Sequence, residues 1–210
     1  MADNPMLQVE GLCFAYPECA VLAQWSVALP AGVSLVRGDE SSGKTTLMRL
    51  LAGELAPQYG AMTLLGQTIG SLGKAAPSAV FWADPRSDAW DAGTARGWLD
   101  SLPARYPRWD RAALTAHVDG FSLPEHLDKP FYALSTGSKR KVLMAGALAS
   151  GAPLTLIDEP VAGLDKPSIT YLAQALGQVA AERERVVLVA HYETLAGVDW
   201  TRVVEIAGGA

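Results

Sequence analysis

Short apolar runs separated by turn residues dominate the first part of the chain. Runs of this kind predict β-strands, here at residues 7–14, 21–29, 33–36, 60–69 (a strand pair around Gly66) and 79–83. One segment differs, because Leu47, Leu50 and Leu51 fall on one face of a helix and a glycine follows them. We therefore predict mostly strands in this region, with a helix at residues 44–53.

Helical patterns replace strand patterns between residues 84 and 151. The predicted helices there are residues 94–102, 109–119 and 137–149. Strand and helix then alternate, with strands at residues 154–157, 186–190 and 203–206 and a helix at residues 167–182. Such alternation favours a parallel sheet with crossover helices. We interpret the chain as a single α/β domain, with residues 1–83 and 152–210 as the core and residues 84–151 as an inserted helical subdomain.

The composition is that of an ordinary globular protein. The 210 residues are 50% hydrophobic and 19% charged, and the formal net charge is −5. Domains that bind nucleic acid usually carry a basic excess, so no nucleic-acid partner is expected. The longest apolar stretch, residues 142–157, is interrupted by glycine, serine and proline and is too short to cross a bilayer.

Residues 38–45 read Gly-Asp-Glu-Ser-Ser-Gly-Lys-Thr and lie between a predicted strand and a predicted helix. This spacing matches the phosphate-binding P-loop. Glycines let backbone N–H groups face the phosphates, and the helix that follows directs its positive end at them. Lys44 would reach the β- and γ-phosphates, and the Thr45 hydroxyl would bind Mg²⁺. The predicted nucleotide contacts are Gly38, Asp39, Glu40, Ser41, Ser42, Gly43, Lys44, Thr45 and Thr46.

Two adjacent carboxylates, Asp158 and Glu159, follow the apolar strand at residues 154–157. Neighbouring strand residues point to opposite faces, so the two acids can serve different tasks. Asp158 would hold Mg²⁺, directly or through water, and Glu159 would polarise the attacking water. A plain acidic loop explains the pair as well when it is taken alone, and the upstream P-loop favours the catalytic interpretation. His191 ends a predicted strand, where ligands bind in parallel sheets; on this residue alone, a surface histidine is the alternative.

These motifs follow the order found in the ATP-binding-cassette (ABC) ATPases, and the chain resembles that family over nearly its full length. Residues 134–138, Leu-Ser-Thr-Gly-Ser, resemble the family's signature motif, and residues 163–165, Gly-Leu-Asp, resemble its D-loop. The resemblance makes His191 the switch histidine and implies that Tyr16 stacks on adenine. It also implies a RecA-like P-loop core with a mostly parallel sheet, an N-terminal antiparallel β subdomain and a helical subdomain that carries the signature motif.

The resemblance implies an ATPase that acts as a pair of chains. Two ATP molecules would lie between two subunits, in a homodimer or in a heterodimer with a similar ATPase, each held by one P-loop and by the signature motif of the other subunit. The pair would drive a polytopic membrane permease from the cytoplasmic face of the cell membrane. The implied nucleotide contacts outside the P-loop are Ser135, Gly137 and Asp165. The implied catalytic residues are Glu159, His191 and Lys44.

Within the family, two segments indicate the direction of transport. Residues 106–110 and 134–141 look most like bacterial exporter ATPases of the drug, peptide and antibiotic-resistance branch. The short length is similar to that of the heme-exporter ATPase of cytochrome c maturation. We therefore expect an exporter, and the alternative is an ATP-dependent regulatory switch with low turnover.

The chain departs from the family pattern at several positions. Ser41 replaces a P-loop glycine, so we expect backbone dihedrals there that suit a non-glycine residue. No glutamine lies between Gln67 and Gln174, and Asp84 takes the position of the Q-loop glutamine, which senses Mg²⁺ in the family. A carboxylate there could still reach Mg²⁺ through water but adds negative charge, so we predict slow or partner-dependent hydrolysis. Residues 139–141, Lys-Arg-Lys, are expected to be mostly a solvated face.

Overall fold

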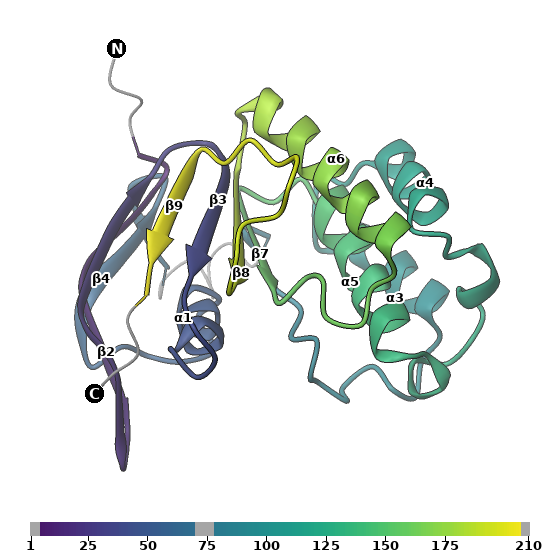
Figure 1. The fold of residues 1–210 in the computed structure, drawn as a ribbon. Helices are drawn as coiled ribbons and strands as arrows, with labels where there is room; N and C mark the ends of the chain where they lie inside the picture. The colour runs from purple at the N-terminus through teal and green to yellow at the C-terminus, as the bar shows by residue number, and fades with distance from the viewer. Residues whose placement is uncertain (1–4, 70–77, 207–210) are drawn as a thin grey trace.

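The computed structural model of the chain describes residues 5–69 and 78–206. Their backbone forms three layers (Figure 1). A parallel sheet lies in the middle, with an antiparallel sheet and helix α1 (Lys44–Leu51) on one side and a group of helices on the other. This arrangement confirms the α/β fold class predicted from the sequence.

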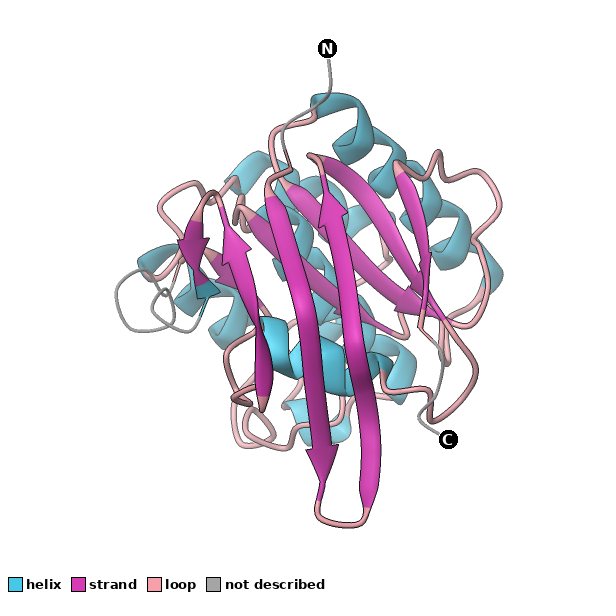
Figure 2. Ribbon diagram, turned by 90° about the vertical axis from the view of Figure 1, so that its left-hand side faces the viewer, coloured by secondary structure: helices cyan, strands magenta, loops and turns pink. Residues whose placement is uncertain are grey.

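The antiparallel sheet has the strand order β2-β1-β4-β5 within the described residues. Its strands are β1 (Leu7–Tyr16), β2 (Cys19–Leu29), β4 (Tyr59–Leu64) and β5 (Gln67–Thr68). Buried and exposed residues alternate at the start of β1, because one face of the sheet packs on the core and the other faces solvent. β1 and β2 form a long hairpin whose turn extends beyond the neighbouring strands (Figure 2).

The parallel sheet has the strand order β6-β7-β8-β3-β9 within the described residues. Its strands are β3 (Gly32–Arg37), β6 (Val80–Phe81), β7 (Leu154–Asp158), β8 (Val186–His191) and β9 (Arg202–Glu205). Every residue of β7 and β8 is buried, as expected for strands covered on both faces. Because all pairs in this sheet are parallel, the carboxyl ends of β3, β7 and β8 meet at one edge. Ligands bind at such an edge in open α/β sheets.

Helices cover the other face of the parallel sheet. They are α3 (Ala95–Ser101), α4 (Arg111–Gly120), α5 (Thr136–Ala149) and α6 (Lys166–Glu182), with short 3₁₀ turns η1 (Leu102–Ala104), η2 (Pro124–His126) and η3 (Phe131–Ala133). Alternate residues of β3 serve the two layers, since Leu35 packs with these helices and Val36 packs with α1 and the antiparallel sheet. No helix in the described part of the chain is long and apolar enough to cross a membrane.

His117 and Tyr171 join α4 to α6 in the interior. The Nδ1 atom of His117 lies 2.9 Å from the Tyr171 hydroxyl, which donates to the carbonyl of Ala116 at 3.0 Å. A hydroxyl carries one proton, so Nδ1 is the donor to the tyrosine oxygen. Burial, followed by the charge of Arg185, lowers the pKa of His117 to about 4. The imidazole is therefore neutral near pH 7.

Candidate active site

The P-loop connects the carboxyl end of β3 to the first turn of α1. The Lys44 side chain folds back across it, and Nζ donates to the carbonyls of Gly38 and Asp39, each at 2.8 Å. No side chain caps the start of α1, so the first N–H groups of that helix lack intrahelical partners. A buried ammonium and free helical N–H groups at one place form an anion site.

Two P-loop glycines are required by the packing around them. A Cβ atom on Gly38 would lie 2.6 Å from the carbonyl oxygen of Ile206, and one on Gly43 would lie 2.5 Å from Cγ1 of Val21. Gly43 also has a φ of 95°, which favours glycine. Val21 belongs to β2, so the antiparallel sheet contacts the P-loop directly.

The expectation for the backbone of Ser41 does not hold. Its φ is 61°, in the left-handed region that favours glycine and that costs other residues roughly 1–2 kcal/mol. The close contacts at Gly38 and Gly43 fix the loop on both sides of this residue. Ser41 therefore adopts the conformation that a glycine would take, rather than one suited to its own side chain.

The remaining predicted P-loop contacts divide into two sets. Asp39 and Glu40 are exposed, whereas Ser42 and Thr46 are buried. The Ser42 hydroxyl has no hydrogen-bond partner within the described residues. Because buried hydroxyl groups are normally hydrogen-bonded, this one is available to a ligand.

Thr45 and Asp158 connect the start of α1 to the end of β7. Thr45 Oγ1 donates to Asp158 Oδ2 at 2.7 Å, while the buried Oδ1 atom has no partner within the described residues. Burial raises the pKa of Asp158, and the hydrogen bond from Thr45 and the charge of Arg86 oppose that rise. A hydroxyl and a carboxylate oxygen are ligands that Mg²⁺ prefers. The residues present therefore fit a magnesium ion.

Glu159 lies between His191 and Lys44. The Nδ1 atom of His191 is 2.8 Å from Oε2, and Nζ of Lys44 is 3.4 Å from Oε1. An ionised carboxylate only accepts, so Nδ1 carries the proton. The other ring nitrogen, Nε2, is buried without a partner in the described chain. The backbone of Glu159 has a φ of 46°, and its N–H donates to the carbonyl of Ala190 in β8 at 2.9 Å.

A family model described as ABC transporter matches residues 23–162, which include the P-loop, Asp158 and Glu159. The chain belongs to the ABC transporter family. This finding confirms the family resemblance seen in the sequence and makes the chain an ATP-binding, ATP-hydrolysing subunit.

Individual ABC relatives cover most of the chain. The chain is 32% identical over 187 residues to the cytochrome c biogenesis ATP-binding export protein CcmA of Pseudomonas putida. This alignment covers 89% of each of the two proteins. It is 31% identical over 216 residues to the cobalt import ATP-binding protein CbiO of Rhodobacter capsulatus, covering 95% of this chain and 75% of that protein. A solved structure titled putative ABC transporter (ATP-binding protein), from Pyrococcus furiosus, has the same fold, with a TM-score of 0.77 at 20% identity over 95% of this chain and 96% of that one. The names of these relatives include both export and import.

The segment that resembles the ABC signature motif begins α5. The hydroxyl of Ser135 caps this helix by accepting the N–H of Ser138 at 3.1 Å. A Cβ atom on Gly137 would lie 2.1 Å from the carbonyl oxygen of Gly163, so the signature segment packs against the D-loop with no room for a side chain. Helices α5 and α1 lie on opposite sides of the parallel sheet (Figure 1). The contacts of Ser135 and Gly137 described above are made with Ser138 and Gly163, not with the P-loop.

Asp165 in the D-loop segment begins helix α6. Its carboxylate accepts the N–H of Ser168 at 2.9 Å and the Nζ proton of Lys141 at 2.6 Å. The bond from Lys141, followed by those from Ser168, holds the pKa of Asp165 far below its usual range. Within this chain, the residue therefore links α6 to α5.

The expectation of a solvated basic face at residues 139–141 is wrong. Lys139 forms an ion pair with Asp91 at 2.7 Å. Arg140 donates from Nε to the carbonyl oxygen of Glu159 at 3.0 Å. Lys141 forms the ion pair with Asp165 described above. All three residues are partly buried, because each side chain pairs with a group on a neighbouring segment.

Tyr16 lies at the end of β1, beside the hairpin turn. The residue is 40% exposed, and its ring packs edge-on against Phe14 with the ring centroids 5.0 Å apart. The next strand along the hairpin carries Val21, which contacts the P-loop at Gly43. An exposed aromatic face on this hairpin is suited to stacking, and the adenine contact of Tyr16 remains a prediction.

The sequence predicted that Asp84 lies at the magnesium site. In the structure, the side chain from this segment that contacts Thr45 is that of Arg86. The Asp84 carboxylate accepts the backbone N–H of Arg86 at 2.9 Å. The guanidinium of Arg86 donates to Thr45 Oγ1 at 2.9 Å and lies 3.8 Å from Asp158 Oδ2. Sequence reasoning missed this arginine and also Arg140. The available signal was the Asp-Pro-Arg-Ser segment at residues 84–87, which is typical of a turn that redirects the chain.

Proposed function

We propose that this chain binds the triphosphate of ATP at the P-loop and hydrolyses it with Glu159 as the general base. The observation that carries the proposal is the 2.8 Å contact between His191 and Glu159, with Lys44 at 3.4 Å from the same carboxylate. A carboxylate beside an anion site can orient water for in-line attack on a phosphoryl group. The glutamate side chain is 23% exposed, so water can reach it.

Each neighbouring residue has a separate task in this proposal. Lys44 would exchange its contacts with two P-loop carbonyls for contacts with the β- and γ-phosphates. Thr45 and Asp158 would hold Mg²⁺, and the bound ion offsets the charge of the phosphates. His191 orients Glu159 through Nδ1, and a second proton on Nε2 would make that nitrogen a donor to the γ-phosphate.

The active unit is proposed to be a pair of chains, either a homodimer or a heterodimer with a similar ATPase. The support is the position of α1 and α5, the helices that follow the P-loop and the signature segment, on opposite sides of the parallel sheet. In a head-to-tail pair, Ser135 and the first N–H groups of α5 would bind the γ-phosphate held by the partner's P-loop. ATP would then join the two subunits, and hydrolysis would release them.

The partner is proposed to be a polytopic membrane permease that exports its substrate, with this subunit on the cytoplasmic face of the membrane. Two observations support export. The relative named as an export protein, CcmA, aligns over 89% of its own length, whereas the importing relative CbiO aligns over 75% of its own length. Co-purification of the tagged chain from membranes with a polytopic protein tests the partner. Transport by the reconstituted pair, measured in vesicles loaded on one side, tests the direction.

A low-turnover regulatory switch is the second candidate function. It is favoured by Asp84 and Arg86, which place charged groups where the family has a glutamine. The two candidates differ in the rate of hydrolysis once a membrane partner is present. Rapid turnover in the reconstituted complex would select the transporter, and a stable ATP-bound pair with little hydrolysis would select the switch.

The direct test of the site is binding of a fluorescent ATP analogue with Mg²⁺ in excess. The full chain should bind it, and Lys44→Ala should weaken binding by at least tenfold, because a charge-assisted hydrogen bond to phosphate is lost. Arg111, an exposed residue at the start of α4, provides the control, and Arg111→Ala should bind as the wild type does. Absence of magnesium-dependent binding by the wild type would refute the proposed site.

A further inference from the structure

The segment after β6 forms a turn that fixes Arg86. Asp84 accepts twice in this turn: its carboxylate from the N–H of Arg86 at 2.9 Å and its carbonyl from the N–H of Ser87 at 3.0 Å. An aspartate that binds the backbone two residues ahead stabilises a tight turn. The Asp84 side chain is therefore occupied with backbone geometry, and the residue that extends from the turn is an arginine.

Arg86 reaches the same two side chains that would hold Mg²⁺. Its Nη1 atom donates to Thr45 Oγ1 at 2.9 Å and lies 3.8 Å from Asp158 Oδ2. The aspartate side chain is fully buried, whereas the arginine side chain is 58% exposed. The solvated guanidinium of Arg86 thus covers the outer side of the buried Asp158 carboxylate. Because most of the arginine side chain is exposed, it can move away without loss of core packing.

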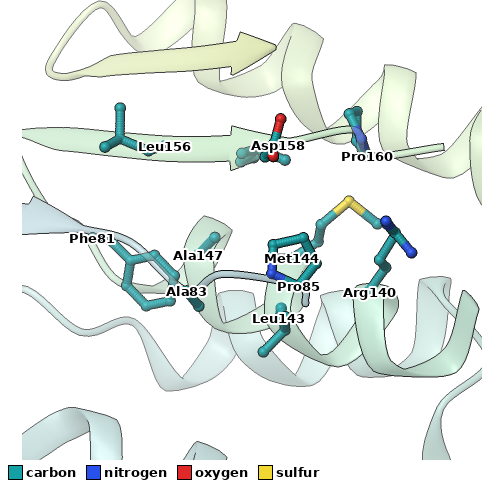
Figure 3. A pocket seen from close by; sticks show the side chains of 11 residues that line it. Phe81, Ala83, Pro85, Arg140, Leu143, Met144, Ala147, Leu156, Asp158 and Pro160 are labelled. Atoms are coloured by element: carbon teal, nitrogen blue, oxygen red, sulfur yellow. The ribbon is translucent and has the colours of Figure 1, made fainter. Parts of the chain in front are cut away.

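A second guanidinium, that of Arg140, approaches from helix α5. Figure 3 shows Arg140 extending from α5 toward the end of β7, with Asp158 and the segment at Pro85 lining the same small pocket. Arg140 donates to the carbonyl of Glu159 at 3.0 Å. Burial lowers its pKa, and the charge of Arg86 lowers it further, as expected for two cations that repel each other. Arg86 is the more exposed of the two and is the one free to move.

We propose that the guanidinium of Arg86 takes the place of Mg²⁺ at Thr45 and Asp158 when no metal is bound. The guanidinium then competes with Mg²⁺ for the side-chain oxygens of these two residues. The inference rests on the proposed nucleotide site. Mg²⁺ binds its oxygen ligands at about 2.1 Å, so an ion on Thr45 and Asp158 would lie next to the guanidinium that contacts the same oxygens, and the two cations would repel each other. The competition gives the site two states, one closed by Arg86 and one opened by Mg²⁺ with nucleotide. Asp84 acts as a positioning residue for Arg86 rather than as a metal ligand.

Two binding measurements on the purified full chain test this exchange, and neither depends on hydrolysis. The first is the Mg²⁺ concentration that gives half-maximal binding of a fluorescent ATP analogue. The second is the affinity for the same analogue in EDTA, where Arg86 adds to Lys44 as a cation available to the phosphates. In Arg86→Ala, the Mg²⁺ requirement should fall and the affinity in EDTA should weaken, each by about two- to fivefold, the range for an exposed ion pair. Arg86→Lys should lie between Arg86→Ala and the wild type, and Arg111→Ala should match the wild type.

Asp84 offers a matched pair of variants that separates positioning from ligation. Asp84→Asn keeps the side-chain oxygen that accepts the N–H of Arg86, whereas Asp84→Ala removes it. If Asp84 positions Arg86, the alanine variant should behave like Arg86→Ala, and the asparagine variant should stay close to the wild type. If Asp84 binds Mg²⁺ itself, both variants should raise the Mg²⁺ requirement, which would overturn the assignment.

The remaining outcomes are equally decisive. An Arg86→Ala variant whose Mg²⁺ and EDTA curves superimpose on those of the wild type would refute the exchange, provided that thermal unfolding shows an intact fold. An increased Mg²⁺ requirement in that variant would refute it as well. A wild type that binds no nucleotide with Mg²⁺ would refute the proposed function and, with it, this inference. Failure of the exchange alone would instead leave the wild type able to bind nucleotide with Mg²⁺, so the two failures are distinguishable.

Discussion

Glu159 and His191 meet at 2.8 Å across the ends of two adjacent parallel strands. The pairing follows from register, because Asp158 at the end of β7 lies opposite Ala190 in β8. His191, the last residue of β8, and Glu159, the residue after β7, come next along the two strands. Two residues that are distant in sequence thereby form one unit beside the P-loop lysine.

The first prediction concerns the general base. Glu159→Gln should reduce ATP hydrolysis by roughly 10²- to 10⁴-fold, the range for loss of a general base. The amide oxygen can still accept from His191, so the affinity for ATP should stay within a few-fold of the wild type. Light scattering after gel filtration should show a stable dimer in the variant with ATP and Mg²⁺. Hydrolysis at the wild-type rate would exclude this role for Glu159.

The second prediction concerns coupling between His191 and Glu159. His191→Ala should slow hydrolysis because the glutamate loses the donor that orients it. When two residues act as a unit, the second substitution adds little to the first. The double variant should therefore hydrolyse ATP about as slowly as Glu159→Gln alone. Multiplicative losses in turnover assays of all three variants would show independent roles.

The third prediction uses the left-handed backbone of Ser41. Ser41→Gly should bind ATP at least as tightly as the wild type, since glycine adopts a φ of 61° without strain. Ser41→Val should weaken binding by about tenfold, because a β-branched residue is a strong outlier in that region. The measurement is nucleotide affinity in excess Mg²⁺. Equal affinities for the two variants would mean that the loop takes another shape when it binds nucleotide.

The fourth prediction compares two helical glycines. Gly137→Ala places a methyl group 2.1 Å from the carbonyl oxygen of Gly163, and overpacking of this kind costs about 1–3 kcal/mol. Gly177→Ala in α6 meets nothing within 4 Å and should stabilise the protein by about 0.5–1 kcal/mol through helix propensity. Chemical denaturation of both variants gives the two free energies of unfolding. A neutral Gly137→Ala would show that the signature segment and the D-loop separate easily.

The fifth prediction follows from the depressed pKa of His117. The folded protein holds this pKa at about 4, below the ordinary histidine value of 6.5, so the unfolded state binds the proton more readily. Stability from this residue is complete above pH 6.5 and is lost as the pH falls toward 4, by up to about 3 kcal/mol. Denaturant midpoints at pH 7 and pH 4.5 should differ more for the wild type than for His117→Gln. Equal differences would mean that other groups account for the acid sensitivity.

Helix and strand positions could be predicted because they depend on local patterns. The apolar run before Asp158 is β7, and the pattern ending at His191 is β8. The position of His191 at the end of a strand, where ligands bind, was also predicted from the parallel topology. The same reasoning correctly indicated a helix directly after the P-loop, which is α1.

Contacts between layers could not be predicted in this way. Arg86 reaches Thr45 only because Asp84 folds the intervening backbone, and no periodicity encodes that geometry. The φ of Ser41 depends on loop closure between two glycines that pack against other segments. Arg140 lies in a charged run that suggests solvent, yet its partner is a backbone carbonyl at the end of another element.

The backbone of Glu159 is fastened to two layers at once. Its N–H binds strand β8 through Ala190, and its carbonyl binds helix α5 through Arg140. The second bond comes from a side chain of α5, so it links the peptide unit that carries the glutamate to the position of that helix.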